Sequence, residues 1–381
     1  MVSIDGPRLA RPDEFDEMMS LLDRYFAYER GGMAARLPHA YDEATPENHA
    51  IVRKDGDIVS HVGAIPQTLT VGEGNEIECW GVSGVTTDKR HRGNGYMTQL
   101  LEFWLDRMAE EGVALADLGG NRQRYAHFGW EQAGREHHYK IRERSFDGSA
   151  GAGMITTYEG GDEQVETLRE LHGDEPYRVR RGRERSRTVF GQRGLETLLY
   201  ESDGDTAYLS LTRESRERTI AEFGGAARGI EALIAHLFSA YDVDSLTAIV
   251  PPRHPRNPEF RRHSRSWSVS EHRKLNVRNL QAVLARFADQ MEARWSRREV
   301  AASGRVTLGL EAESEGVELV YDRDGITVEA FDGTPEVRRP RGEMAGLLFG
   351  MHDREAELKA DYPVFETIFP LDFFIWPADR V

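Results

Sequence analysis

The chain has 381 residues, of which 39% are hydrophobic and 30% are charged, and its formal net charge is -16 at pH 7. This length is sufficient for two or three ordinary domains, each with its own hydrophobic core. A chain this acidic lacks the basic face that binding to a phosphate backbone requires, so we expect no nucleic-acid partner.

The sequence has no pattern of an export signal or a membrane span. The first residues lack a basic and apolar leader, and no apolar run approaches the ~20 residues that cross a bilayer. The single cysteine, Cys79, cannot form an internal disulfide, which is typical of a reducing compartment. It lies in the strand-like stretch "EIECWGVSGV", where we expect a small buried side chain and not a nucleophile. We therefore predict a cytoplasmic protein without a membrane partner.

The first predicted elements are a helical entry region and an antiparallel meander. Apolar residues recur at helical spacing over residues 15–26. Residues 50–87 are then typical of strands that break at Asp55-Gly56, a strong hairpin signal, and at residues 72–75. A helix with one apolar face follows from Met97 to about Gly112, and the apolar strand "VALADL" comes next.

Two further units follow a linker of small residues, "DGSAGAGM", that begins at Asp147. The second unit partly repeats the order of the first, with a hairpin at residues 195–211, a strand at 218–223, a helix from Ile230 and a strand at 245–251. The third begins with a predicted helix that carries Val277 and Trp295 on its apolar face, followed by the strands "RVTLGL", "VELVY" and "GITVEAF". The predicted domains are 1–147, 148–273 and 274–381.

The stretch "TTDKRHRGNGYMTQLL", residues 86–101, collects cations and two glycines directly before a helix. A helix N-terminus leaves its first amides without internal partners and carries a partial positive charge, so it favours anions. Gly93 and Gly95 would expose backbone amides, while Arg90 and Arg92 would add charged donors, a combination that suits a pyrophosphate. A plain strand-to-helix turn with exposed arginines is the alternative that the motif alone leaves open.

The context of this loop excludes two common phosphate-binding units. The preceding strands lack the alternating helices of a Rossmann unit, and no Gly-Lys-Ser/Thr of a Walker loop occurs. "VTTDKRHRGNGYM" instead resembles the signature segment of the Gcn5-related N-acetyltransferase (GNAT) superfamily. The resemblance implies that backbone around Val85 and Thr87 pairs with the pantetheine arm of acetyl-coenzyme A. It also implies that the pyrophosphate is held by Arg90, His91, Arg92, Gly93, Asn94, Gly95 and Tyr96.

A second segment, "GGNRQRYAHFGWEQAG", is similar to the other recognisable segment of that superfamily. By the resemblance, Asn121 lies near the amides of the cofactor and Tyr125 near the thioester sulfur. A phenol held there can protonate the departing thiolate, so Tyr125 is the candidate general acid. A tyrosine that is packed only for its ring area is the alternative. The developing oxyanion needs a backbone amide, for which the strand near Val85 is the candidate.

In order and length the whole chain resembles the Eis-like acetyltransferases, which join two acetyltransferase folds to a C-terminal sterol-carrier-protein-like domain. The resemblance predicts a mixed α+β fold, with a catalytic GNAT domain at 1–147, a degenerate second GNAT domain at 148–273 and an SCP2-like domain at 274–381. The second unit lacks R-x-x-G-x-G and carries Glu222 near the corresponding entrance, so we expect no cofactor there. For the third we favour a structural role. The family also implies a homo-oligomer, either a trimer or a hexamer.

In that family the terminal carboxylate of the chain enters the first active site, as general base or as a partner of the incoming amine. Carried onto this sequence, the residue is Val381, and an α-carboxyl group is ionised at neutral pH. A tail that packs and stops at the surface is the alternative for "FPLDFFIWPADRV".

Other clusters of polar residues carry no chemistry that we can name. The pairs His137-His138 and His352-Asp353 lack the spacing of zinc ligands, so we predict no metal. The basic run of residues 178–187 is interrupted by glutamates, which favours an exposed helix or loop face, or a subunit contact.

The sequence therefore predicts an N-acetyltransferase that transfers acetyl from acetyl-coenzyme A to a primary amine, either a small molecule or a lysine side chain. Direct attack is expected, because no activated Cys or Ser lies beside the loop. Two alternatives stay open. One is a non-catalytic protein that binds acyl-coenzyme A or lipid, and the other is an acyltransferase that uses a longer acyl chain.

Overall fold

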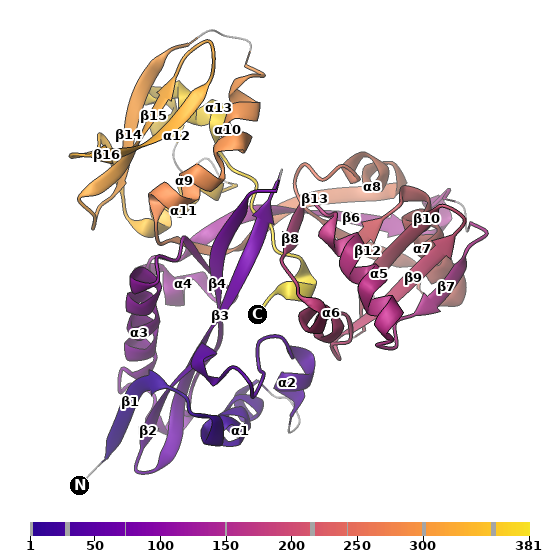
Figure 1. The fold of residues 1–381 in the computed structure, drawn as a ribbon, viewed down its shortest axis with the longest axis horizontal. Coiled ribbons are helices and arrows are strands. Elements are labelled where there is room, and N and C mark those ends of the chain that lie inside the picture. Colours follow the sequence, from indigo (N-terminus) through magenta and orange to yellow (C-terminus); the bar gives the residue numbers. More distant parts are fainter. Residues whose placement is uncertain are drawn as a thin grey trace.

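The computed structural model describes residues 3–26, 31–72, 74–148, 151–213, 218–241, 243–298, 302–351 and 356–381. Helices combine with a 13-stranded sheet and a separate four-stranded sheet, which confirms the predicted mixed α+β class (Figure 1). Within these ranges no helix is long and apolar enough to cross a membrane. The pair His352-Asp353 lies outside the described residues.

The first unit is an antiparallel meander covered by helices. Its elements are β1 (Ile4–Leu9), α1 (Phe15–Tyr25), α2 (Gly32–Arg36), β2 (His49–Lys54), β3 (Asp57–Val71), β4 (Glu76–Thr87), α3 (Tyr96–Glu110), β5 (Leu115–Leu118), α4 (Arg122–Tyr125) and β6 (Glu131–Arg142). The predicted entry helix, the hairpin at Asp55-Gly56 and the amphipathic helix before Gly112 are confirmed. Helix α3 buries its apolar face, including Leu100 and Trp104, against the meander.

The second unit has its own helices and strands. They are β7 (Met154–Thr157), α5 (Asp162–Gly173), β8 (Tyr177–Val179), α6 (Arg183–Phe190), β9 (Leu195–Ser202), β10 (Asp205–Thr212), β11 (Arg218–Gly225), α7 (Ala227–Ala240), β12 (Ser245–Val250), α8 (Asn257–His263) and β13 (Ser264–Val277). The predicted hairpin is formed by β9 and β10, which pair in register from Leu195↔Thr212 to Ser202↔Asp205.

The two units share one continuous sheet because β6 and β13 cross between them. Strand β13 pairs with β5 through residues 274–277 and with β6 along most of its length, so it lies between two strands of the first unit. Strand β6 in turn pairs with β12 of the second unit through residues 137–142. The domain boundary predicted at 273/274 falls inside β13, and the three-domain division stays a prediction.

The start of the third unit corrects one prediction. Val277 does not lie on a helix but ends β13, where it is fully buried and pairs with Leu115. The helix begins later because Asn279 caps it, with its side-chain oxygen 2.9 Å from the Ala282 amide nitrogen. The remaining elements are α9 (Leu280–Arg286), α10 (Ala288–Trp295), β14 (Gly304–Leu310), β15 (Glu315–Tyr321), β16 (Ile326–Asp332), β17 (Val337–Arg339), α11 (Arg341–Phe349), α12 (Ala356–Asp361) and α13 (Pro363–Ile368).

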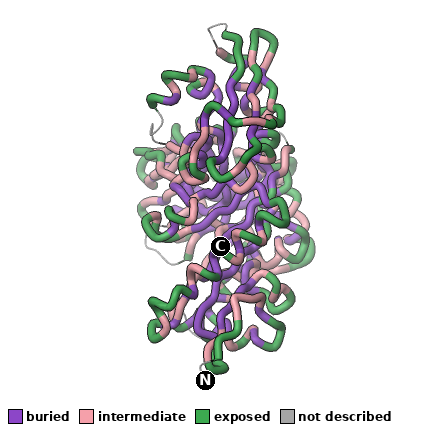
Figure 2. Tube along the Cα trace, turned by 90° about the vertical axis from the view of Figure 1, so that its left-hand side faces the viewer, coloured by how far each residue is buried: buried purple, intermediate pink, exposed green. Residues whose placement is uncertain are grey.

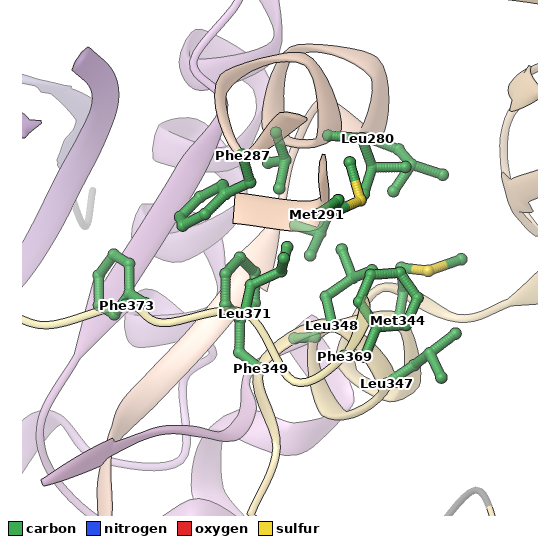
Figure 3. Packing of buried hydrophobic residues seen from close by; sticks show 14 of the residues in the cluster. Leu280, Phe287, Met291, Met344, Leu347, Leu348, Phe349, Phe369, Leu371 and Phe373 are labelled. Atoms are coloured by element: carbon green, nitrogen blue, oxygen red, sulfur yellow. The ribbon is translucent and has the colours of Figure 1, made fainter. Parts of the chain in front are cut away.

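The C-terminal tail passes through the cores of all three units. Phe369, Leu371 and Phe373 pack among the side chains of α9, α10 and α11 in the third unit (Figure 3). The next aromatic residues, Phe374 and Trp376, belong to the core of the second unit. The chain then ends in the middle of the molecule, whereas its N-terminal end lies at one tip (Figure 2). Each fully buried aromatic side chain contributes about 1.5–3 kcal/mol of transfer free energy, so the tail is firmly anchored.

Candidate active site

The strands β4 and β5 separate where the candidate site begins. They pair in parallel from Cys79↔Leu115 to Val82↔Leu118, and β5 then ends while β4 continues to Thr87. The opening on this side of β4 is part of a cleft of about 590 Å³, which Val85 and Thr87 line. Backbone groups of β4 are therefore accessible for a ligand that lies along the strand.

Strand β4 carries a bulge at this opening. Gly84 and Val85 together stand opposite the single residue Val62 of β3, because the register shifts between Gly63↔Ser83 and His61↔Thr86. Gly84 has a φ of +60°, and a Cβ atom there would lie 2.5 Å from the hydroxyl oxygen of Tyr41. Only glycine fits this position, so the bulge is built into the sequence.

The glycine loop forms the other wall of the cleft. Gly93 and Gly95 have φ angles of +81° and +77°, and Gly95 is the residue that caps the N-terminus of α3. A Cβ atom at Gly93 would meet no heavy atom within 4 Å, so the backbone faces open space. The cleft is lined by Tyr25, Phe26, Val85, Thr86, Thr87, His91, Arg92, Gly93, Gly95, Tyr96, Met97, Thr98 and Arg124.

Three of the candidate cofactor residues do not line this cleft. The exposed guanidinium of Arg90 pairs with Asp88 at 3.1 Å and holds the pKa of that carboxyl well below its usual range. The side-chain amide of Asn94 donates to the His91 carbonyl oxygen at 2.8 Å. Asn121 is exposed and caps α4, with its side-chain oxygen 2.8 Å from the Gln123 amide nitrogen. All three side chains thus organise the turns around the cleft.

Three residues that line the cleft, Tyr25, Phe26 and Arg124, come from outside the segment of β4, the glycine loop and α3 that the sequence pointed to. Tyr25 and Phe26 come from the end of α1, and Arg124 comes from α4, one residue before Tyr125. The guanidinium carbon of Arg92 lies 5.8 Å from the centre of the Tyr25 ring. Arg92 and Arg124 place two positive charges on the cleft, which complements an anionic ligand.

Tyr125 lies at the end of α4 and is 5% exposed. Its ring makes an edge contact with Trp130 at a centroid distance of 6.5 Å. Burial raises the pKa of the Tyr125 hydroxyl above its usual value of 10, so the phenol keeps its proton at neutral pH. That protonation state is the one a general acid needs.

The chain ends at Val381 beside β3, between the first and second units (Figure 1), and Val381 packs against an apolar cluster of the first unit. Its side chain is half-buried and lies against Gly81 of β4, one residue before β4 and β5 separate. Its main-chain oxygen accepts a hydrogen bond from Arg273 at 3.3 Å, and Arg273 also donates to the buried carboxylate of Asp117 at 2.6 Å. Val381 thus lies against β4, and neither Val381 nor Tyr125 is among the residues that line the cleft.

A buried ion triad fixes the last turn of the tail and corrects two predictions. Arg181, from the basic run predicted to be exposed, is fully buried and donates to Asp379 at 2.9 Å and to Glu222 at 2.9 Å. Glu222, predicted near an entrance, is buried in β11 and is also bonded to His172 at 3.0 Å. A guanidinium can serve both carboxylates because its donors form a planar fork, and this tertiary pairing keeps the residues inside.

Cys79 and the histidines provide no separate centre in the part of the chain that the structure describes. Cys79 is fully buried, which confirms the prediction, and burial raises the pKa of its thiol. Over the described ranges, no group of three or more His, Cys, Asp or Glu side chains has an arrangement that could hold a metal ion.

One known family is similar to most of the first unit. The family model described as an acetyltransferase (GNAT) domain matches residues 7–133. We refer to this matched segment, about a third of the chain, as the GNAT domain. The GNAT domain contains the bulged strand β4, the glycine loop and Tyr125. A comparison with curated proteins gave no match.

The fold of the whole chain is shared with solved structures. A probable N-acyltransferase from Enterococcus faecalis V583 is 16% identical with a TM-score of 0.73, and the match covers 98% of each chain. A GCN5-related N-acetyltransferase from Kribbella flavida is 15% identical with a TM-score of 0.70, covering 99% of this chain and 98% of that one. Eis1 from Mycobacterium abscessus is 14% identical with a TM-score of 0.67, covering 98% and 99%. At sequence identities of 14–16%, these matches show that the fold is shared and no more.

Proposed function

We propose that the protein is an N-acetyltransferase that transfers the acetyl group of acetyl-coenzyme A to a primary amine in the GNAT domain. The observation that carries the proposal is the cleft in which the open backbone of Gly93 and Gly95 adjoins both the N-terminus of α3 and the bulged end of β4. In this arrangement the loop amides would bind a pyrophosphate, and the free edge of β4 would pair with the extended pantetheine arm.

The residues that are present fit acetyl-coenzyme A. The amides around Gly93 and Gly95, together with Arg92, Arg124 and the N-terminus of α3, would hold the pyrophosphate. The backbone of Val85 and Thr87 would pair with the pantetheine arm along the edge of β4 that β5 leaves uncovered. Arg90, Asn94 and Asn121 would act by shaping the two turns.

The bound thioester supplies an activated acetyl group and a thiolate leaving group. The amine nitrogen attacks the acetyl carbon and the C–S bond breaks. We assign Tyr125 as the acid that gives its hydroxyl proton to the sulfur, which its raised pKa supports. The carboxylate of Val381 takes the proton that the amine loses, which its place beside Gly81 supports. The Val85 amide donates to the acetyl oxygen.

The acceptor would enter between α1, the bulge and the tail. This side of the GNAT domain is mostly apolar, with Met18, Leu22 and Ile65 in the cluster against which Val381 packs. An acceptor bound beside Val381 would lie near the terminal carboxylate, whose negative charge favours an ammonium group over an anion. The net charge of -16 would also attract cationic acceptors to the molecule. Small amines and lysine side chains both fit this description.

We further propose an Eis-like organisation, with a second, degenerate GNAT fold and an SCP2-like C-terminal domain. The likeness to Eis1 over nearly the whole chain supports it. In this arrangement the third unit has a structural role, which the anchoring of the tail in its core supports. We also propose a cytoplasmic location, which the single cysteine, Cys79, supports, and a trimeric or hexameric assembly, which rests on the resemblance.

The proposal is tested by following thiol release from acetyl-coenzyme A in the presence of a panel of polyamines, aminoglycosides and lysine peptides. Mass spectrometry then identifies the acetylated product. We expect release that depends on the amine and product acetylated on nitrogen. Binding of acetyl-coenzyme A without turnover on any amine would favour a non-catalytic binding protein, and turnover only with longer acyl donors would favour the acyltransferase alternative.

A further inference from the structure

Two buried histidines hold the carbonyl side of the bulge in β4. His49 at the start of β2 and His61 in β3 have no exposed surface. Nδ1 of His61 lies 2.8 Å from the carbonyl oxygen of Gly84, and Nε2 of His61 lies 3.1 Å from Nδ1 of His49. Neither ring takes part in the proton transfers proposed for the acetyl transfer.

The hydrogen bonds fix the tautomer of both rings. A carbonyl oxygen only accepts hydrogen bonds, so Nδ1 of His61 carries a proton. Burial lowers the pKa of His61 to about 4 and that of His49 to about 3, so both rings are neutral at pH 7. Nε2 of His61 is then an acceptor, and the proton between the rings belongs to Nδ1 of His49. The chain of donors runs from His49 through His61 to Gly84.

The Gly84 carbonyl and the Val85 amide belong to one peptide group. Among the described residues the cis peptide bonds are Gly6-Pro7 and Phe369-Pro370, so the peptide between Gly84 and Val85 is trans. In a trans peptide the C=O and N–H bonds point in opposite directions. Because the carbonyl points to His61, the N–H points away from the buried histidines, and Val85 lines the cleft.

The surroundings prevent this peptide from turning. Tyr41 stacks on His49 with ring centroids 5.4 Å apart, and its hydroxyl oxygen lies 2.8 Å from the hydroxyl oxygen of Ser83. Rotation of the peptide would break the bond to His61 and leave a buried carbonyl without this partner. The histidine pair and Tyr41 thus enclose the bulge from the side opposite to the cleft.

We propose that His61 is a positioning residue for acetyl transfer, which fixes the peptide between Gly84 and Val85 so that the Val85 N–H donates to the oxygen of the reacting acetyl group. His49 orients the His61 ring. A hydrogen bond accepted by the carbonyl also polarises the peptide, which makes its N–H a stronger donor. This role rests on the proposed function, because it concerns the same reaction.

Three variants of the full chain test this role. His61→Leu removes the donor, whereas His61→Asn keeps a side-chain N–H at about the place of Nδ1. Val52→Ala, in the core on the neighbouring strand β2, serves as a destabilised control that leaves the bond to Gly84 intact. We expect His61→Leu to lower kcat by about 10²-fold, the size of the loss of one oxyanion donor. We expect His61→Asn to recover much of this loss, and Val52→Ala to keep the wild-type kcat.

Two readouts separate positioning from general damage. The Kd of acetyl-coenzyme A should change little in His61→Leu, because the glycine loop is untouched, and nitrogen NMR of the wild type should show His61 protonated at Nδ1. Wild-type turnover with an unchanged kcat in His61→Leu, or a His61 protonated only at Nε2, would overturn the positioning role alone. Absence of turnover by folded wild type on every amine would overturn the proposed function and this role with it.

Discussion

The contact between Gly81 and the last residue offers a direct way to move the terminal carboxylate. A Cβ atom at Gly81 would lie 2.3 Å from Cγ2 of Val381 and 3.2 Å from Oδ1 of Asp117. Carbon atoms in ordinary contact are about 3.5–4.0 Å apart. Gly81→Ala therefore forces Val381 to retreat by about 1 Å or more.

The expected consequence of Gly81→Ala is a loss of rate without a loss of fold. A misplacement of about 1 Å in a reacting group can cost about 10²-fold, so we expect kcat to fall by this factor if the Val381 carboxylate accepts the proton of the amine. The tail should stay docked, because Phe373 and Asp379 hold it in the other units. The Kd of acetyl-coenzyme A should remain near the wild-type value, since Gly81 does not line the cleft.

A second substitution should restore the activity. The Val381 Cβ atom would lie 3.7 Å from the new Cβ atom, which is an ordinary contact distance. Val381→Ala removes Cγ2 and keeps the carboxylate, so the double variant should recover most of the kcat. Steady-state kinetics on the wild type, the two single variants and the double variant measure this. A Gly81→Ala variant with wild-type kcat, or a double variant as slow as the single one, would refute the reasoning.

Two further predictions concern Tyr125 and the buried triad. Tyr125→Phe should lower kcat by about 10²-fold with an unchanged Kd for acetyl-coenzyme A. In the wild type, activity should not fall through loss of the Tyr125 proton below about pH 10, because the pKa of this hydroxyl is raised. If Tyr125→Phe and the wild type had equal kcat values, Tyr125 would not be the acid. Arg181→Met leaves Glu222 and Asp379 buried without their cation, so urea unfolding should show a loss of about 3–5 kcal/mol. Burial alone would raise the pKa of Glu222, but Arg181 and His172 lower it to about 2, so this part of the stability should be present above about pH 4.5 and disappear toward pH 2.

The elements that the sequence predicted well have strong local signals. Helix α3 follows from its apolar spacing, and the turn before β3 follows from Asp55-Gly56. The glycine loop could be placed on the cleft because Gly93 and Gly95 precede a helix whose start was clear. In each case the pattern and the structure depend on residues that are close together in the chain.

The features that the sequence did not predict depend on distant partners. Strand β13 was missed because its first half is exposed and polar around Trp267, and it forms through pairing with β6. Arg181 and Asp379 are 198 positions apart, so the basic run gave no sign that one arginine is buried. His61 has no local signal either, because its role comes from a bulge on another strand.

The binding of acetyl-coenzyme A tests the central claim most directly, because it needs no knowledge of the acceptor. Calorimetric titration of the wild type should show one site per chain. A Gly93→Asp and Gly95→Asp double variant, which puts side chains and negative charge on the open loop, should lose this binding, whereas Asn94→Asp, outside the cleft lining, should weaken it less. Folded wild type that does not bind, or a double variant that binds as tightly as the wild type, would contradict the account.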